Sequence, residues 1–323
     1  MFRTVNDEVF FNHVELRLHK TLSPSLVGRL SDLVARTFTD FLASLQDLDI
    51  SSCMAREIHG ESPLPRPTIY SRLLRCWEGF VRDEIRLIKP SDSVSRLINL
   101  HVGRYVLNDL AGVLSAGSED VVYLSPQTAR TLRGVAEVDG LLPVLRGYVG
   151  ADFIVKTLRK YRGFRVGDLD IHKLVGELIE SYFRELRIAL EALGVSTRAL
   201  ECVGCVERFE GLKHSLRRAL REGRDLASVL TPLTPTQRGV LANSSSDTHA
   251  LEFLLAAFPT ILCHNLLRAA PPSAETLLHY ILLKDWELRT FSQVIYLITS
   301  GYPVDVIQEE VAGWARFYES LPK

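Results

Sequence analysis

Apolar residues recur at helical spacing along most of the chain, and this pattern limits the possible folds more than any other feature of the sequence. A clear case follows Asp170, where a large apolar residue returns every four positions from Leu174 to Leu190. Such spacing places these side chains on one face of an α-helix. Strict alternation of apolar and polar residues, which marks a half-buried strand, is almost missing. The sequence therefore predicts an all-α protein.

Capping and breaking residues set the expected limits of several helices. Ser23 and Pro24 suit an N-cap and a first turn, and apolar residues then share one face as far as Leu45. Pro90 is expected to stop the helix that comes next. Further helices are predicted over the ranges 67–89, 93–114 and 171–190.

A weak internal repeat suggests three helical units. Three long predicted helices are each followed by a turn and a shorter segment that mixes apolar and polar residues. They carry the tyrosines Tyr105, Tyr182 and Tyr280, which lie at unequal intervals. We expect the units to share a core and to cover the ranges 1–116, 117–195 and 196–323.

Composition excludes several classes of protein. The chain has 323 residues, of which 46% are hydrophobic, enough for a substantial core. Its net charge is only −1, so nucleic acid is not an expected partner. The first residues lack the pattern of a signal peptide, and no apolar run reaches the roughly 18–20 residues that a membrane span needs. We expect a soluble protein that meets a membrane only through partner subunits.

Signatures of catalysis are also missing from the sequence. It contains neither of the glycine motifs that bind phosphate, Gly-x-x-x-x-Gly-Lys-[Ser/Thr] and Gly-x-Gly-x-x-Gly. It also lacks a His-Glu-x-x-His helix and a Gly-x-Ser-x-Gly elbow. We therefore expect no catalytic residue and no cofactor. His101 and His279 stand in apolar helices, which favours core residues over metal ligands.

The five cysteines leave one metal or redox hypothesis open. Their odd number and scattered positions argue against a secreted disulfide scaffold. Cys202 and Cys205 stand at a spacing that can chelate zinc or form a redox disulfide. His214 and the Cys263–His264 dipeptide could complete a zinc site, but their spacing matches no familiar zinc module. Structural cysteines are the favoured interpretation.

Charges crowd into the middle of an apolar helix near the C-terminal end of the chain. Lys284 falls within one apolar stripe of this helix, while Trp286 projects from the opposite side. A helix that is apolar on two sides is expected to be sandwiched between neighbours. The charges can then pair locally, Lys284 with Glu287 and Asp285 with Arg289. Pairing gives them a structural role without catalysis.

The ends of this helix are equally well marked. Ser273 and Glu275 suit its N-terminus. Gly301 suits a left-handed position just past its C-terminus, and Pro303 can open the following helix.

This C-terminal stretch resembles the C-type rotor protein of the archaeal-type (A/V-type) rotary ATPases, which is related to the d-type rotor protein of the eukaryotic vacuolar ATPase. Family members typically carry Lys-Glu-x-Glu, then Asn-Leu-Arg, a Gly-Leu-Pro-like turn and Ile-x-Glu-x-Leu. The residues that match this pattern are Lys284, Asp285, Glu287, Gly301, Pro303, Ile307, Glu310 and Val311. Thr290, Phe291 and Ser292 replace the Asn-Leu-Arg element, which leaves its residue roles open.

The resemblance implies an all-helical, three-unit funnel that lies on a membrane rotor ring. Such a rotor protein is non-catalytic and couples the central shaft, made of D-type and F-type subunits, to the proteolipid ring during proton or sodium transport. It would be cytoplasmic and peripheral to the cell membrane. The matching residues would have structural roles.

Two alternatives belong to other functional classes. One is a helical scaffold unrelated to ATPases, whose repeats would stack in a line. The other is a metal or redox protein that uses Cys202 and Cys205.

Overall fold

The computed structural model describes residues 4–23, 30, 32, 34, 37–58, 64–116, 121–223, 226–230, 238 and 248–319. Helices dominate the described residues, which contain no strand beyond an isolated bridge between Glu137 and Arg165, so the prediction of an all-α fold is confirmed. The helices are α1 Val5–Leu18, α3 Phe38–Ser44, α4 Ile50–Glu57, α5 Arg66–Ile88, α6 Asp92–Ala116, α7 Pro126–Arg133, α8 Val138–Arg146, α9 Asp152–Leu158, η2 Arg159–Tyr161, η3 Val166–Asp168, α10 Ile171–Ala192, α11 Thr197–Glu222, α12 Leu226–Val229, α14 Thr248–Leu267, α15 Ala274–Thr299 and α16 Val304–Glu319.

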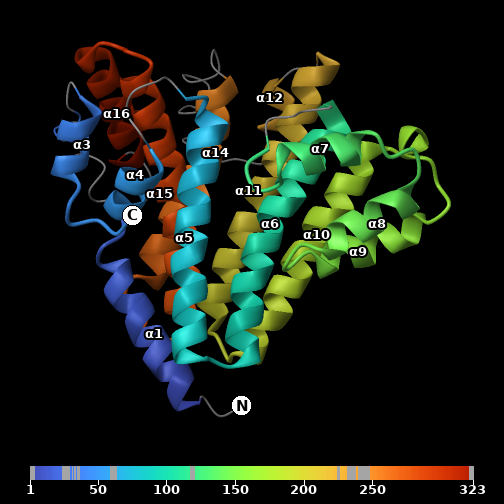
Figure 1. Cartoon of the computed structure of the whole chain (residues 1–323), viewed down its shortest axis with the longest axis horizontal. Helices are drawn as coiled ribbons and strands as arrows, with labels where there is room; N and C mark the ends of the chain where they lie inside the picture. Colours follow the sequence, from blue (N-terminus) through green and yellow to red (C-terminus); the bar gives the residue numbers. More distant parts are fainter. Residues whose placement is uncertain are drawn as a thin grey trace.

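Long helices form the body of the molecule, and short ones form a smaller lobe at one side. Figure 1 shows α5, α6, α10, α11 and α15 crossing the body, with α7, α8 and α9 in the lobe on the right. Neighbouring pairs in the body include α6 with α10, α11 with α14, and α15 with α5. The three expected units and their boundaries remain a prediction.

The long helices form where their apolar faces and end signals agree. The side chain of Asp170 caps α10 by accepting from the backbone N–H of Lys173 at 3.0 Å. The predicted stripe from Leu174 to Leu190 is buried. Helix α5 ends at a left-handed Lys89 (φ 53°), directly before the predicted stop at Pro90. Both helix predictions are confirmed.

The predicted single helix over residues 24–45 is wrong, because the chain breaks at Thr37 and Phe38–Ser44 form a separate helix. Thr37 is extended (φ −120°, ψ 152°), and its hydroxyl caps a separate short helix, α3, by accepting from the N–H of Asp40 at 3.1 Å. The hydrogen bond to Thr37 satisfies an N–H group at the start of the new helix. It therefore stabilises a helix start at this position over a continuous helix. The beginning of the predicted helix, residues 24–29, lies outside the described residues.

Close backbone contact ties the smaller lobe to the body. Gly150, in the turn before α9, has a φ of +76° and lies against Gly103 and the carbonyl of Asn99 in α6. A Cβ atom at either glycine would collide with backbone atoms of the other segment. The lobe is therefore positioned by main-chain packing against α6.

Within the described part of the chain, none of the helices combines the length and the apolar character needed to cross a membrane.

Candidate functional site

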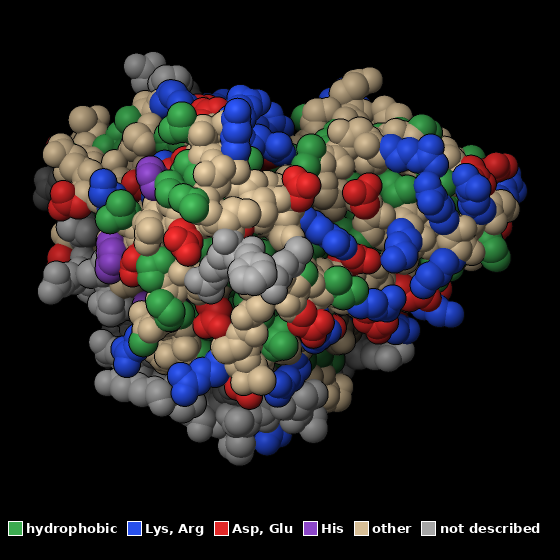
Figure 2. Space-filling view, turned by 90° about the horizontal axis from the view of Figure 1, so that it is seen from below, with side chains coloured by type: hydrophobic (Ala, Val, Ile, Leu, Met, Phe, Trp, Pro, Cys, Tyr) green, Lys and Arg blue, Asp and Glu red, His purple; other side chains and the backbone are tan. Residues whose placement is uncertain are grey.

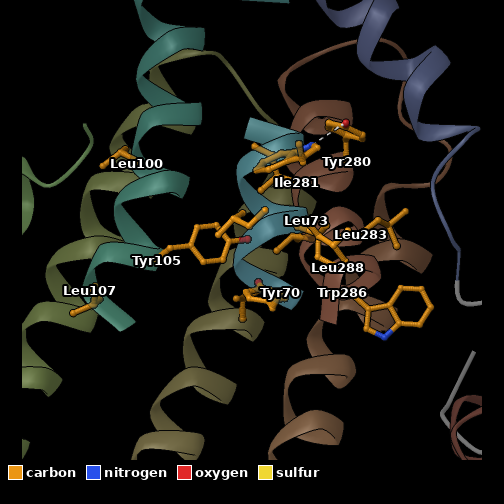
Figure 3. Packing of buried hydrophobic residues seen from close by; sticks show 14 of the residues in the cluster. Tyr70, Leu73, Leu100, Tyr105, Leu107, Tyr280, Ile281, Leu283, Trp286 and Leu288 are labelled. Atoms are coloured by element: carbon orange, nitrogen blue, oxygen red, sulfur yellow. Dashed lines mark hydrogen bonds between the residues drawn. The ribbon is translucent and has the colours of Figure 1, made fainter. Parts of the chain in front are cut away.

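Helix α15 lies in the interior and buries three charged side chains. It contacts α1, α5 and α14, and the large indole of Trp286 is almost fully buried. Lys284, Asp285 and Glu287 are only 1%, 8% and 0% exposed. The helix is thus apolar and buried on both sides, so the predicted sandwich is confirmed. Figure 3 shows Tyr280, Ile281, Leu283, Trp286 and Leu288 of this helix among their neighbours.

Both predicted ends of α15 are present. The hydroxyl of Ser273 accepts from the backbone N–H of Glu275 at 3.2 Å. Gly301 has a φ of +75°, and the N–H of Tyr302 reaches back to the carbonyl of Leu297 at 3.1 Å. Pro303 stands directly before α16, whose first turn includes a bond from the N–H of Ile307 to the carbonyl of Pro303.

Asp285 is the centre of a buried polar cluster. Its Oδ1 accepts hydrogen bonds from the hydroxyls of Tyr70 and Tyr105, each at 2.7 Å. Its Oδ2 accepts from Nε of Arg289 at 3.1 Å, the ion pair predicted from the sequence. Tyr70 belongs to α5 and Tyr105 to α6, so one carboxylate joins three helices. Figure 3 shows Tyr105 reaching from α6 toward α5, on which Tyr70 lies.

The surroundings keep Asp285 charged and His101 neutral. Burial alone would raise the pKa of Asp285, but the guanidiniums of Arg289 and Arg104 hold it well below its usual range. Burial lowers the pKa of His101 to about 3, against an opposing effect of Asp285. Because the Tyr105 hydroxyl donates to Asp285, it can accept a hydrogen bond from Nε2–H of His101 at 3.2 Å. The neutral imidazole therefore supports the tyrosine that binds the carboxylate.

Lys284 and Glu287 form a second buried pair on the same helix. Their side chains are in direct contact, as predicted. The other oxygen of Glu287 accepts from the backbone N–H of Leu22 at 2.8 Å. The ammonium of Lys284 lies 5.6 Å from the ring centroid of Tyr280, whose hydroxyl accepts from the indole N–H of Trp77 at 3.0 Å. The pair thus attaches α15 to the segment after α1 and, through Tyr280, to α5.

A third buried ion cluster joins α6 to α11. The guanidinium of Arg104 contacts the carboxylate of Glu210, which also pairs with Lys213 at 2.9 Å. Burial would raise the pKa of Glu210, but Arg104 and Lys213 lower it to about 2. Both cations are less than 10% exposed. The guanidinium of Arg104 lowers the pKa of both Asp285 and Glu210, so it links the two clusters electrostatically.

Asp109 fixes the connection that leads from α6 to the smaller lobe. Its carboxylate accepts from three successive backbone N–H groups, those of Val122, Tyr123 and Leu124, at 2.9, 2.6 and 2.7 Å. Burial raises the pKa of Asp109, and these three donors oppose the rise. The loop is held by one side chain from the last third of a long helix.

These buried hydrogen bonds and ion pairs hold neighbouring helices together. Tyrosine, arginine, lysine and backbone donors satisfy the buried carboxylates, as buried charges require. A cavity of about 20 Å³ remains beside His101 and Arg104, between α6, α10, α11 and α15, and has room for about one water molecule. A chamber of that size cannot hold a nucleotide or an organic cofactor.

Cysteine pairing differs from the sequence hypothesis. Cys202 forms a disulfide with Cys263, which links α11 to α14, and Cys205 is a half-buried free thiol. A second disulfide joins Cys53 of α4 to Cys76 of α5. The chelating or redox pair of Cys202 and Cys205 is therefore not formed, because Cys202 bonds to Cys263 across the interface between α11 and α14. The two disulfides were not expected from the number and scatter of the cysteines.

The histidines that could have completed a zinc site have other contacts. Nε2 of His214 lies 3.0 Å from the carbonyl oxygen of His172. Nδ1 of His264 lies 2.9 Å from Nε2 of His279. Among the described residues, no group of three or more histidine, cysteine, aspartate or glutamate side chains is arranged to hold a metal ion.

Sequence reasoning found the charges of α15 but missed most of their partners. The residues not singled out are Leu22, which binds Glu287, Tyr70 and Arg104, which act on Asp285, and Glu210, which pairs with Arg104. The sequence marks Tyr105 only as a repeat position. Each stands in a different element from Asp285 or Glu287, and no local spacing in one sequence connects them.

No protein-family model matches this chain, and no curated protein matches it either.

Proposed function

We propose that this chain is a non-catalytic rotor protein of an A/V-type ATP synthase or ATPase, of the C type. In this role it couples the central shaft to the membrane proteolipid ring during ATP-driven or ATP-forming transport of protons or sodium ions. The observation that carries the proposal is the C-terminal pattern of Lys284, Asp285 and Glu287, followed by Gly301 and Pro303 and a second amphipathic helix. This pattern resembles the closing segment of that family.

The packing of α15 supports a mechanical role. A part that transmits torque must resist bending between the surfaces on which its neighbours act. Here Asp285 bonds to α5 and α6, while Glu287 bonds to the backbone at Leu22. These contacts are buried and charge-assisted, so they are among the stronger hydrogen bonds in proteins. They would oppose sliding of α15 against its neighbours.

The proposed partners are D-type and F-type shaft subunits on one side and the proteolipid ring on the other. In this arrangement the protein is cytoplasmic and peripheral to the membrane, and partner subunits supply its contact with the ring. The three units would be arranged as a funnel around the axis of rotation. The chain itself would need neither a cofactor nor a catalytic residue.

The two alternative functions have less support. In a linear scaffold, each repeat contacts only its neighbours in sequence. Here α15 packs against α1 and α5 from the other end of the chain. A redox or zinc role for Cys202 and Cys205 would require Cys202 to leave its disulfide with Cys263.

Reconstitution with purified rotor parts tests the proposal. The chain should bind a shaft complex of D-type and F-type subunits, and it should also bind detergent-solubilised proteolipid ring. The surface variant Arg86→Gln should bind as the unmodified chain does, because Arg86 is exposed and its ion pair among the described residues is with exposed Asp83. If the folded chain bound neither part when both were present, the rotor function would be excluded.

A further inference from the structure

The segment from Arg159 to Arg165, here called the basic loop, concentrates positive charge and aromatic rings at the edge of the smaller lobe. Its sequence is RKYRGFR, with four basic residues and two aromatic residues in seven positions. The four basic residues are exposed, and the aromatic side chain of Phe164 is 52% exposed. Figure 1 shows this stretch, between α9 and α10, at the outer right-hand side of the molecule.

The basic loop has a fixed conformation despite its exposure. The N–H of Val138 donates to the carbonyl of Phe164 at 3.1 Å, and the N–H of Val166 donates to the carbonyl of Ala136 at 2.8 Å. Gly163 turns the chain with a φ of +76°, and its N–H donates to Asp139 at 2.9 Å. These bonds tie both sides of the turn to the start of α8, so Phe164 is presented by a preformed backbone.

Tyr161 supports Phe164 from behind. The hydroxyl of Tyr161 donates to Glu177 at 2.7 Å, which fixes the tyrosine against α10. Its ring meets that of Phe164 edge to face, with centroids 6.2 Å apart. Phe164 therefore has a ring on one side and solvent on the other. An exposed phenylalanine held in this way is suited to contact with an external apolar phase.

The charge of this lobe differs from that of the whole chain. Residues 126–166 contain eight Lys or Arg and three Asp or Glu, a surplus of five positive charges, whereas the whole chain has a net charge of −1. All eight basic residues are exposed. Figure 2 shows Lys and Arg side chains gathered over the lobe on the right of that view. The surplus will attract polyanionic surfaces.

Ion pairing leaves these charges available. Lys160 lies 3.6 Å from Glu177, and Arg162 lies 3.2 Å from Asp139, both with basic side chains about 60% exposed. Exposed pairs of this kind contribute little and exchange partners readily. The side chains of Arg159 and Arg165 make no ion pair with the described residues. An anion can therefore bind without breaking a buried contact.

We propose that the basic loop docks directly on an anionic phospholipid membrane. Arg159, Lys160, Arg162 and Arg165 would bind headgroup phosphates, and Phe164 would enter the interfacial layer. A single-stranded nucleic acid fits less well, because it needs a groove with several stacking rings, whereas this loop protrudes and exposes one. The lipid contact would add to the contact through partner subunits, and it does not depend on the rotor function.

Vesicle flotation with the purified full chain tests this directly. The probes are vesicles of phosphatidylcholine alone and vesicles that also contain phosphatidylglycerol, each at low and high salt. We expect binding only to the anionic vesicles, with loss at high salt. Replacing Arg159, Lys160 and Arg165 together with Gln should weaken binding roughly 100-fold. Phe164→Ser should weaken it roughly 10-fold.

A matched control removes the same charge elsewhere. The exposed residues Lys20, Arg86 and Arg198, replaced together with Gln, should leave binding within about threefold of the original. Circular dichroism should show that both triple variants remain helical. Equal binding to neutral vesicles, or equal loss in the control, would overturn the proposal. Loop-dependent binding to single-stranded RNA without binding to vesicles would instead assign the loop to nucleic acid.

Discussion

Helix α15 and the basic loop use charged residues in opposite ways. In α15, Lys284 and Asp285 are buried: Lys284 pairs with Glu287 of the same helix, and Asp285 accepts a hydrogen bond from Tyr70 of α5. In the basic loop, Arg159 and Arg165 face solvent and make no ion pair with the described residues. The residue types are similar, but access to water differs. Buried charges hold helices in one arrangement, whereas exposed charges remain ready for a partner.

The difference predicts unequal sensitivity to substitution. Removing one member of a buried set leaves its partners without water and without a counter-charge, which costs several kcal/mol. Removing an exposed charge leaves its neighbours solvated. The following experiments test this contrast from the largest expected effect to the smallest.

Asp285→Ala should cause the largest loss of stability. It leaves the hydroxyls of Tyr70 and Tyr105 and the guanidinium of Arg289 without their common acceptor, so we expect a loss of about 3–5 kcal/mol. Urea unfolding followed by circular dichroism measures it. Asp285→Asn keeps an acceptor oxygen and should lose less. A loss below about 1 kcal/mol in the alanine variant would show that the cluster does not lock the helices.

Lys284→Ala should lower the free energy of unfolding by about 3 kcal/mol, because the buried carboxylate of Glu287 would lose its counter-charge and keep, among the described residues, the bond from Leu22. The defect should appear in stability or in docking to rotor partners. Replacing Lys284 with Met and Glu287 with Leu together should recover part of the loss, since no charge is then buried alone. If the single variant folds and docks normally, the proposal that this pair has a structural role is wrong.

Acid should weaken the fold through His101. The folded protein keeps this imidazole neutral down to about pH 3, whereas the unfolded chain takes up a proton near pH 6.5. The unfolded state therefore binds more protons between these values, and stability falls as the pH decreases, by about 1.4 kcal/mol per pH unit from this residue. His101→Gln keeps an N–H donor for Tyr105 and should reduce the slope by that amount. Unfolding curves between pH 6 and pH 4 in steps of about one unit measure it, and an unchanged slope would contradict the assignment.

The smallest effect is expected in the basic loop. Arg159→Gln should change the free energy of unfolding by less than about 0.5 kcal/mol, because the side chain is exposed. Thermal unfolding measures this small difference. A loss comparable to that of Lys284→Ala would remove the distinction between the two regions.

The sequence was most informative where cause and consequence lie within a few residues. The ion pair of Asp285 with Arg289 and the cap of Ser273 follow from helical spacing and local hydrogen bonding. The break at Thr37 was missed because its local cap competes with an apolar pattern that continues past it. A periodic stripe does not reveal which of two helical arrangements is more stable.

Contacts between distant elements could not be predicted. Tyr70 and Tyr105 stand in ordinary apolar stripes, and nothing nearby indicates that their hydroxyls meet at Asp285. The bond of Cys202 with Cys263 depends in the same way on the packing of α11 against α14. The volumes of the side chains and the arrangement of the helices in space determine which of these residues come into contact. The basic loop, in contrast, can be read from seven consecutive residues, although its exposure cannot.

The bond between the N–H of Leu22 and Glu287 has a consequence for synthesis. The two residues are 265 positions apart, and α15 also supplies the acceptor for Tyr70. While the chain emerges from the ribosome, α1 and α5 are synthesised long before α15, the helix against which both of them pack. At typical elongation rates of about 5–20 residues per second, that interval lasts on the order of ten seconds or more. The apolar faces of α1 and α5 would spend this time uncovered or shielded by temporary contacts, which makes the nascent chain a natural client for chaperones.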